Sequence, residues 1–195
     1  MKHGFTHRPA VVFCLLILPF ELRQAGASCP DQTMKLFDLT GEVAVVIGGR
    51  GALGGAIADG LAAAGAVIAI LGRNQERGEA RAKEICQAGG RASFFAADAM
   101  QPASLARAHA ELQKAIGSPT ILVNAAGGTD PNATVTAERP LEQISLQAWQ
   151  NNFDLNVVGG VLLPCQEFGP AMVARGKGSV INIASVSAHT PLSRV

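Results

Sequence analysis

The feature that most constrains the fold is a short apolar strand that leads directly into a loop made mostly of glycine. Residues Val43 to Ile47 are rich in β-branched side chains, as buried strands are, and G-G-R-G-A-L-G-G follows over residues 48–55. An Ala-rich stretch typical of a helix then continues to about Ala64. Because glycines let a helix pack closely against the end of a strand, this pattern predicts the strand–turn–helix unit of a parallel α/β sheet.

The same alternation of strand and helix continues along the chain. The further elements predicted are a strand over Val67 to Leu71, a helix over Glu76 to Ala88, a strand over Ala92 to Ala96, a helix over Pro102 to Ile116, a strand over Thr120 to Asn124, a long helix capped by Ser145 and ending near Ala174, and a strand over Ser179 to Ala184. Right-handed crossovers join parallel strands, so the pattern predicts an α/β protein with a doubly wound parallel sheet of order 3-2-1-4-5.

Composition excludes several classes of protein. The chain has 195 residues and a formal net charge of +1, which fits one globular domain and does not favour nucleic acid as a partner. Only 5% of the residues are aromatic, as expected where small side chains let helices lie close on a parallel sheet. The four cysteines and four histidines show neither paired spacing nor a shared cluster, so we expect no disulfide framework and no metal site.

A ligand site is expected at the carboxyl ends of the strands, beside the first strand, where the strand order reverses. Gly48, Gly51 and Gly54 lie there and would present bare backbone N–H groups and a helix N-terminus to a pyrophosphate. A tight strand-to-helix turn without any ligand would have the same glycines. The loop alone therefore leaves both interpretations open.

Four motifs in consistent order resemble the short-chain dehydrogenase/reductase family, from about residue 36 onward. The segment 47–54 resembles the pattern T-G-x-x-x-G-x-G, and N-A-A-G over residues 124–127 resembles the N-N-A-G after the fourth strand. Asn156 resembles the family's active-site Asn, and Ser185 within I-A-S-V resembles its catalytic Ser. The resemblance implies a Rossmann fold and hydride transfer between a nicotinamide and a carbonyl or alcohol carbon. Within the family, the sequence is most similar to sugar-acid oxidoreductases of the mannonate or fructuronate type.

The resemblance also implies which residues bind the cofactor. They are Gly48, Arg50, Gly51, Leu53, Gly54, Arg73, Asn74, Asp98, Ala99, Asn124, Ala125, Ala126 and Gly127. Arg73 lies where an acidic residue would bind a ribose 2'-hydroxyl and would instead pair with a 2'-phosphate, assisted by Arg50. NADP is therefore the expected cofactor, with NAD as the alternative if Arg73 is only a surface residue. Asp98 would accept a hydrogen bond from the adenine or, alternatively, serve as a turn residue.

Two residues depart from the family pattern. Ile47 replaces a Thr whose hydroxyl ties the loop to the fourth strand, and Ala52 stands at the second glycine position. The added methyl group of Ala52 would weaken cofactor binding only if the backbone there requires a positive φ.

The expected catalytic residues are Ser185, which would hold the substrate oxygen, and Asn156, which would hold a water linked to a catalytic Lys. In the family a Tyr exchanges the hydroxyl proton, and the neighbouring Lys lowers the pKa of that Tyr. The sequence contains no tyrosine. We therefore expect a chain that is cut off beyond Val195, before a Tyr-x-x-x-Lys motif, and that is inactive by itself. The alternative is a short protein that binds a dinucleotide or a partner without catalysis.

The first 33 residues differ from the rest and are expected to be a leader, with the dinucleotide-binding domain over residues 34–195. An apolar run from Ala10 to Phe20 and the small residues Ala25-Gly26-Ala27 match a secretory signal. We favour a translation start at Met34, because a nicotinamide enzyme needs a cytoplasmic cofactor pool. The protein is thus expected to be cytoplasmic, with secretion as the alternative. A small carbonyl or alcohol compound is the expected partner, without nucleic acid or membrane, and the full-length protein is expected to be a homo-oligomer.

Overall fold

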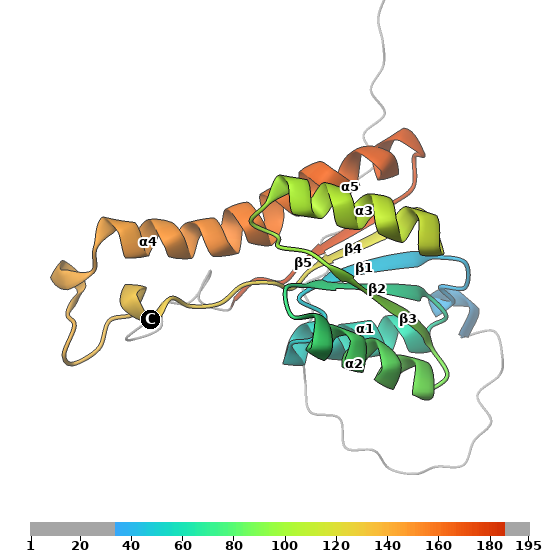
Figure 1. The fold of residues 1–195 in the computed structure, drawn as a ribbon, viewed down its shortest axis with the longest axis horizontal. Helices are drawn as coiled ribbons and strands as arrows, with labels where there is room; N and C mark the ends of the chain where they lie inside the picture. Colours follow the sequence, from blue (N-terminus) through green and yellow to red (C-terminus); the bar gives the residue numbers. More distant parts are fainter. Residues whose placement is uncertain (1–33, 186–195) are drawn as a thin grey trace, which may run out of the picture.

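The computed structural model describes residues 34–185, which form a five-stranded parallel sheet between two layers of helices (Figure 1). The strands are β1 (Val43–Ile47), β2 (Val67–Gly72), β3 (Arg91–Ala96), β4 (Ile121–Asn124) and β5 (Ser179–Asn182). They run in the order β3-β2-β1-β4-β5, so the predicted doubly wound sheet is confirmed. The predicted leader, residues 1–33, lies outside the described residues, as do residues 186–195.

Each crossover between strands contains a helix, so helices cover both faces of the sheet. The helical segments are η1 (Met34–Phe37), α1 (Ala52–Ala63), α2 (Gln75–Gln87), α3 (Pro102–Ile116), η2 (Pro131–Ala133), η3 (Leu141–Gln143), α4 (Leu146–Phe153), η4 (Asp154–Leu162) and α5 (Leu163–Ala174). α1 and α2 lie on one face, whereas α3 and α5 lie on the other (Figure 1). The first turn of α3 starts with Pro102, as predicted.

The core is centred on β1, whose side chains alternate between the two faces of the sheet. Val45 and Ile47 pack in one cluster with Phe168 of α5. Val46 packs in the second cluster, with Ala58 of α1. All five residues of β1 are buried, which explains why this strand is a continuous apolar run without polar alternation.

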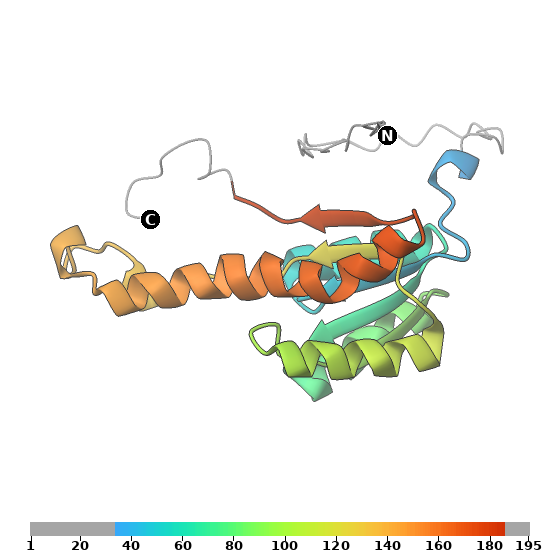
Figure 2. The ribbon, with the colours of Figure 1, turned by 90° about the horizontal axis from the view of Figure 1, so that it is seen from above.

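The longest helical segment changes its winding halfway along. Its α4 and α5 parts are α-helical, but the η4 part between them is π-helical. The predicted cap at Ser145 is confirmed, since its hydroxyl accepts from the Ala148 N–H at 3.1 Å, and so is the helix end near Ala174; the π-helical part is an additional feature. The α4 end extends beyond the sheet, whereas α5 packs on it (Figure 2).

The composition of this helix invites comparison with a membrane span. By length and hydropathy alone, the 29 residues Leu146–Ala174 are apolar enough to cross a bilayer. A single helix of this kind is weak evidence for a membrane-spanning segment, because core helices pass the same test. Its α5 part contributes Pro164, Phe168 and Met172 to the buried interior. That is the position of a core helix packed on a sheet.

Candidate functional site

The loop after β1 brings three strand ends together at one glycine. Gly48 has a φ of +81°, and a Cβ at this residue would lie only 2.7 Å from the Ala125 carbonyl oxygen. Its N–H donates to the carbonyl of Leu71 at 3.0 Å, and the Ala125 N–H donates to the carbonyl of Ile47 at 3.0 Å. The ends of β1, β2 and β4 therefore meet at Gly48, where both the backbone angle and the available space require glycine.

The N-terminus of α1 rests directly on this loop. A Cβ at Gly54 would lie 2.5 Å from the Gly48 carbonyl oxygen. Gly51 is the N-cap of α1 and has no side chain that could accept a hydrogen bond from the first N–H groups of the helix. Within the described residues, these N–H groups therefore have no side-chain cap. Ala52 is the first residue of the helix and thus has helical geometry, so its methyl group requires no positive φ. Uncapped N–H groups and the positive end of the helix dipole together fit an anionic group.

Asn124 was expected to bind the cofactor, but its side chain is turned into the sheet. It is 2% exposed, and its Nδ2 donates to Asn182 Oδ1 at 2.8 Å, which ties β4 to β5. Within the described part of the chain its Oδ1 has no hydrogen-bond partner. Its register partner on β1 is Ile47, the residue that stands in place of a Thr. A contact between Asn124 and a cofactor stays a prediction.

Asn156 lies in η4 and fixes the loop that follows β4. Its Nδ2 donates to the Gly128 carbonyl at 2.7 Å and to the Asn152 carbonyl at 2.8 Å, and its Oδ1 accepts from the Gly128 N–H at 3.0 Å. A Cβ at Gly127 would lie 2.6 Å from this Oδ1. Asn156 thus lies within the π-helical part of the long helix, Asp154–Leu162. The role of Asn156 in holding a water stays a prediction.

Asp98 follows β3 at the same edge of the sheet. Its Oδ1 accepts from the Met100 N–H at 3.0 Å, and its own N–H donates to Ser104 Oγ at 3.1 Å. The turn role considered for Asp98 is therefore observed, and the bond to adenine stays a prediction. The neighbouring Ala99 packs against the core cluster under α3 and α5.

The remaining predicted residues also follow strand ends, with different exposure. Leu53 is 60% exposed on the first turn of α1, and Asn74 is the N-cap of α2. Ala126 follows β4 and is partly buried. Ser185 lies three residues after β5, at the edge where Asn182 pairs in register with Asn124, and it is exposed. The parallel sheet thus gathers residues from distant parts of the chain at one edge.

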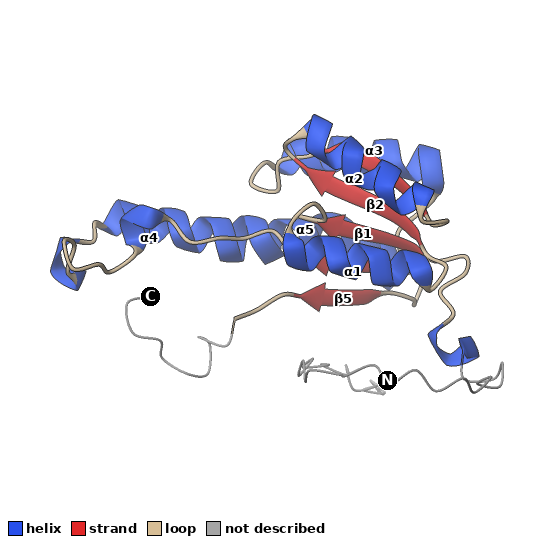
Figure 3. Ribbon diagram, turned by 90° about the horizontal axis from the view of Figure 1, so that it is seen from below, coloured by secondary structure: helices blue, strands red, loops and turns tan. Residues whose placement is uncertain are grey.

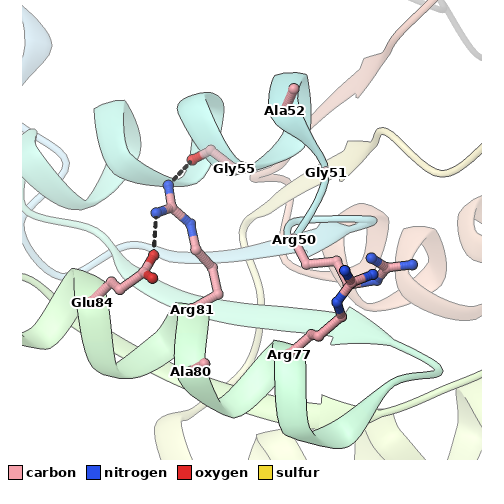
Figure 4. A pocket seen from close by; sticks show the side chains of 8 residues that line it. All are labelled: Arg50, Gly51, Ala52, Gly55, Arg77, Ala80, Arg81 and Glu84. Carbon is pink, nitrogen blue, oxygen red and sulfur yellow. Dashed lines mark hydrogen bonds and ion pairs between the residues drawn. The ribbon is translucent and has the colours of Figure 1, made fainter.

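A hollow lies beside the glycine loop, between α1 and α2 (Figure 4). It is lined by Arg50, Gly51, Ala52, Gly55, Arg77, Ala80, Arg81 and Glu84. Arg81 is ion-paired with Asp59 and, at 2.7 Å, with Glu84, and it donates to the Gly55 carbonyl at 3.1 Å. The hydrogen bond with Glu84, followed by that with Asp59, raises the pKa of the Arg81 guanidinium despite its partial burial.

The other two arginines of the hollow differ from Arg81. Among the described residues, the guanidinium groups of Arg50 and Arg77 have no hydrogen bond or ion pair, and Figure 4 draws them converging at one end of the hollow. Arg77 is not among the residues predicted from the sequence. Its position on the first turn of α2, just after the Asn74 cap, could have indicated that it lies near the carboxyl end of β2. Arg73, which was predicted, is exposed but does not line the hollow.

No metal centre is found in the part of the chain that the structure describes, where no three His, Cys, Asp or Glu residues form a group suited to hold an ion. The strand ends present backbone N–H groups, arginines and the polar residues Asn156 and Ser185.

Sequence comparison places this chain near a set of oxidoreductases. A family model described as short chain dehydrogenase matches residues 42–195. The chain is 36% identical over 168 residues to the uncharacterized oxidoreductase UxuB of Bacillus subtilis, covering 81% of this chain and 59% of that protein. It is 35% identical over 158 residues to D-threitol dehydrogenase of Mycolicibacterium smegmatis, covering 81% and 58%. The chain thus spans somewhat more than half the length of these relatives.

Solved structures agree with the sequence matches. A putative D-mannonate oxidoreductase from Haemophilus influenza with bound NAD superposes with a TM-score of 0.76 at 29% identity, covering 84% of this chain and 61% of that one. A gluconate 5-dehydrogenase from Burkholderia cenocepacia in complex with NADP and tartrate superposes with a TM-score of 0.74 at 30% identity, with the same coverage.

Proposed function

The chain belongs to the short-chain dehydrogenase family, and we propose that it forms the cofactor-binding part of an NAD(P)-dependent oxidoreductase acting on a carbonyl or alcohol substrate. The observation that carries this proposal is the glycine cradle at the carboxyl edge of the sheet. A Cβ at Gly48 or Gly54 would come within 2.7 or 2.5 Å of a backbone oxygen. The cradle leaves the N-terminus of α1 open, which fits the pyrophosphate of a dinucleotide.

The cofactor we propose is NADP, with NAD as the alternative. Gly51 and the first N–H groups of α1 would bind the pyrophosphate, and Arg73 would lie near the adenosine ribose. When bound, the nicotinamide would supply or accept the hydride. The two solved relatives support the choice without deciding it, since one was crystallised with NAD and the other with NADP.

The substrate would lie between the loop after β4 and the end of β5. Ser185 would hold the reacting oxygen, and Asn156, which already bonds both the N–H and the carbonyl of Gly128, would keep the loop in place. A sugar acid is the substrate class we favour. Relatives described as acting on mannonate and gluconate support this choice.

Proton transfer needs a group that the 195-residue sequence does not contain, because it has no tyrosine. We propose that this chain alone does not turn over substrate, and that in a longer protein a Tyr and a Lys complete the site. The missing tyrosine also favours one second candidate, a dinucleotide-binding protein without catalysis. For the whole protein we propose a cytoplasmic homo-oligomer.

The test measures dinucleotide binding to the chain and to two variants of the same helix. Gly54→Ala places a methyl group against the Gly48 carbonyl, so we expect NADPH binding, followed by its fluorescence, to weaken at least about tenfold. Gly60→Ala is the matched control, because a Cβ at Gly60 meets nothing within 4 Å. Equal titration curves for both folded variants would contradict the proposed binding site.

A further inference from the structure

We infer that Asn152 is a positioning residue of this protein, which holds the loop after β4 in the place that the nicotinamide half of the dinucleotide requires. The inference rests on the proposed function and concerns a residue that the sequence motifs did not select. Asn152 is half-buried on α4, one helical turn before Asn156. Both side chains bond to the loop after β4, which runs alongside α4 (Figures 1 and 2).

The loop after β4 has little regular structure of its own. Between the end of β4 at Asn124 and the start of α4 at Leu146, the chain contains only the short 3-10 turns η2 and η3. Fixing the backbone of such a long loop in one conformation costs entropy. Contacts from another element must therefore offset that cost if the loop is to be ready for a ligand.

Two asparagines supply such contacts at two points of the loop. Asn156 Nδ2 donates to the Gly128 carbonyl at 2.7 Å, and its Oδ1 accepts from the Gly128 N–H at 3.0 Å. Two residues further along, the Asp130 N–H donates to Asn152 Oδ1 at 3.1 Å. Asn152 also steadies the first contact, because its Oδ1 and its carbonyl oxygen accept from Asn156 Nδ2 at 3.3 and 2.8 Å. We call Asn152 and Asn156 the asparagine clamp.

The same helical segment lies against the start of the loop. A Cβ at Gly160 would be 3.0 Å from the Ala126 carbonyl oxygen, and a Cβ at Gly127 would be 2.6 Å from Asn156 Oδ1. Helix and loop are therefore in close contact from Ala126 onward. Asn152 extends this contact to Asp130, the N-cap of η2, so it fixes the far end of the segment that the clamp holds.

The order of the sheet indicates which half of a dinucleotide this loop would meet. β2 lies on one side of β1, and β4 lies on the other. In a doubly wound sheet the pyrophosphate binds at the N-terminus of α1, and the adenosine ribose lies by the end of β2. The half of the ligand that carries the nicotinamide is then directed toward the ends of β4 and β5. A loop that is already ordered there lowers the cost of binding that half.

The test compares NADPH with 2'-phospho-ADP-ribose, which lacks only the nicotinamide ring. Calorimetry measures both ligands with the unaltered protein, Asn152→Leu and Asn152→Asp. Leu is close to Asn in size but accepts no hydrogen bond. We therefore expect Asn152→Leu to weaken NADPH binding about fivefold, while 2'-phospho-ADP-ribose changes less than about twofold. The pair NADH and ADP-ribose is measured in the same way, so the result does not depend on which cofactor is preferred.

Asn152→Asp tests whether the acceptor oxygen is the cause. Within the described residues, Oδ1 is the side-chain atom of Asn152 that forms hydrogen bonds, and a carboxylate retains this acceptor. We expect this variant to bind NADPH within about twofold of the unaltered protein. A general loss of structure would not be rescued in this way.

Asn151→Leu is the matched control, because it makes the same change at the neighbouring exposed residue, whose Oδ1 accepts from Gln147 of the same helix. It should leave all affinities unchanged. Asn152→Ala removes the same oxygen without adding an apolar side chain, so it replaces Asn152→Leu if that variant does not fold. Thermal unfolding checks that every variant is folded.

Three results would overturn the inference. If Asn152→Leu weakens both ligands of a pair equally, or changes neither, Asn152 does not position the nicotinamide half, although the proposed function stands. If Asn152→Asp binds NADPH as weakly as Asn152→Leu does, the acceptor oxygen is not the cause. If the unaltered, folded protein binds none of the four nucleotides, the proposed function fails as well.

Discussion

β1 and β5 are both rich in Val and Ile, but their environments in the sheet are opposite. Every residue of β1 is at most 7% exposed, whereas Val180 and Ile181 of β5 are 43% and 40% exposed. β1 has a strand on each edge and helices on both faces; β5 pairs only with β4 within the described residues and lies at the edge of the sheet (Figure 3). Burial here is decided by the neighbours that a strand has, and not by how apolar its residues are.

The same substitution on both strands measures this difference directly. Val45 on β1 and Val180 on β5 lie at the same level of the sheet, since both are in register with Leu122. We expect Val45→Ala to lower the free energy of unfolding by about 2–3 kcal/mol, because it removes buried methyl groups and leaves a cavity. Val180→Ala should cost less than about 1 kcal/mol. Urea unfolding of both variants gives the two values, and equal losses would show that β5 is as buried in solution as β1.

A smaller effect on stability is expected at Asn124 of β4, the strand between β1 and β5. Its Oδ1 is buried and, among the described residues, has no hydrogen-bond partner. Ile47→Thr and Ile47→Val remove similar volume from its register partner, but only Thr provides a hydroxyl. A buried Thr is ordinarily worse than Val. Here we expect Ile47→Thr to be the more stable variant, with a free energy of unfolding about 1 kcal/mol higher than that of Ile47→Val, because the Thr hydroxyl can donate to Asn124 Oδ1. If the Val variant is the more stable one, the orphaned oxygen is satisfied in another way.

The smallest effect is expected for an ion pair that connects the two regions. Glu42, before β1, accepts from Lys177, before β5, at 2.5 Å and from Thr120 Oγ at 2.6 Å. The Lys177 hydrogen bond, then the Thr120 hydrogen bond, hold the pKa of the Glu42 carboxyl below its ordinary value of 4.5. Because the folded pKa is the lower one, the stabilisation is present above about pH 4.5 and is lost as the pH falls through the folded pKa.

We expect Lys177→Ala to cost less than about 1 kcal/mol at pH 7, since the lysine side chain is 66% exposed. The difference from the unaltered protein should shrink between pH 7 and pH 3, as urea unfolding at each pH would measure. Glu111→Gln, an exposed substitution without a hydrogen bond or ion pair among the described contacts, is the control and should show no such trend. A constant difference at all pH values would mean that Lys177 acts through packing.

The fold was predictable because its signals are local. Val43–Ile47, the glycines after it and Pro102 each specify a strand, a turn or a helix start, and the crossover rule then leaves one strand order. The π-helical part of the long helix was not predictable. Within this π-helical part, Asn156 forms hydrogen bonds with Gly128. The two residues are 28 positions apart, so no local sequence pattern encodes this contact.

The sequence by itself determined the doubly wound sheet, the glycine cradle at its carboxyl edge and the residue types gathered there, because backbone propensities and periodicity act over a few residues. Only the tertiary structure decided that Asn124 ties β4 to β5, that Arg81 is neutralised by Asp59 and Glu84, and that Arg77 shares a hollow with Arg50. Each of these depends on which side chains from different elements meet. These side-chain contacts depend on how the helices and strands pack together, and not on residue spacing along the chain.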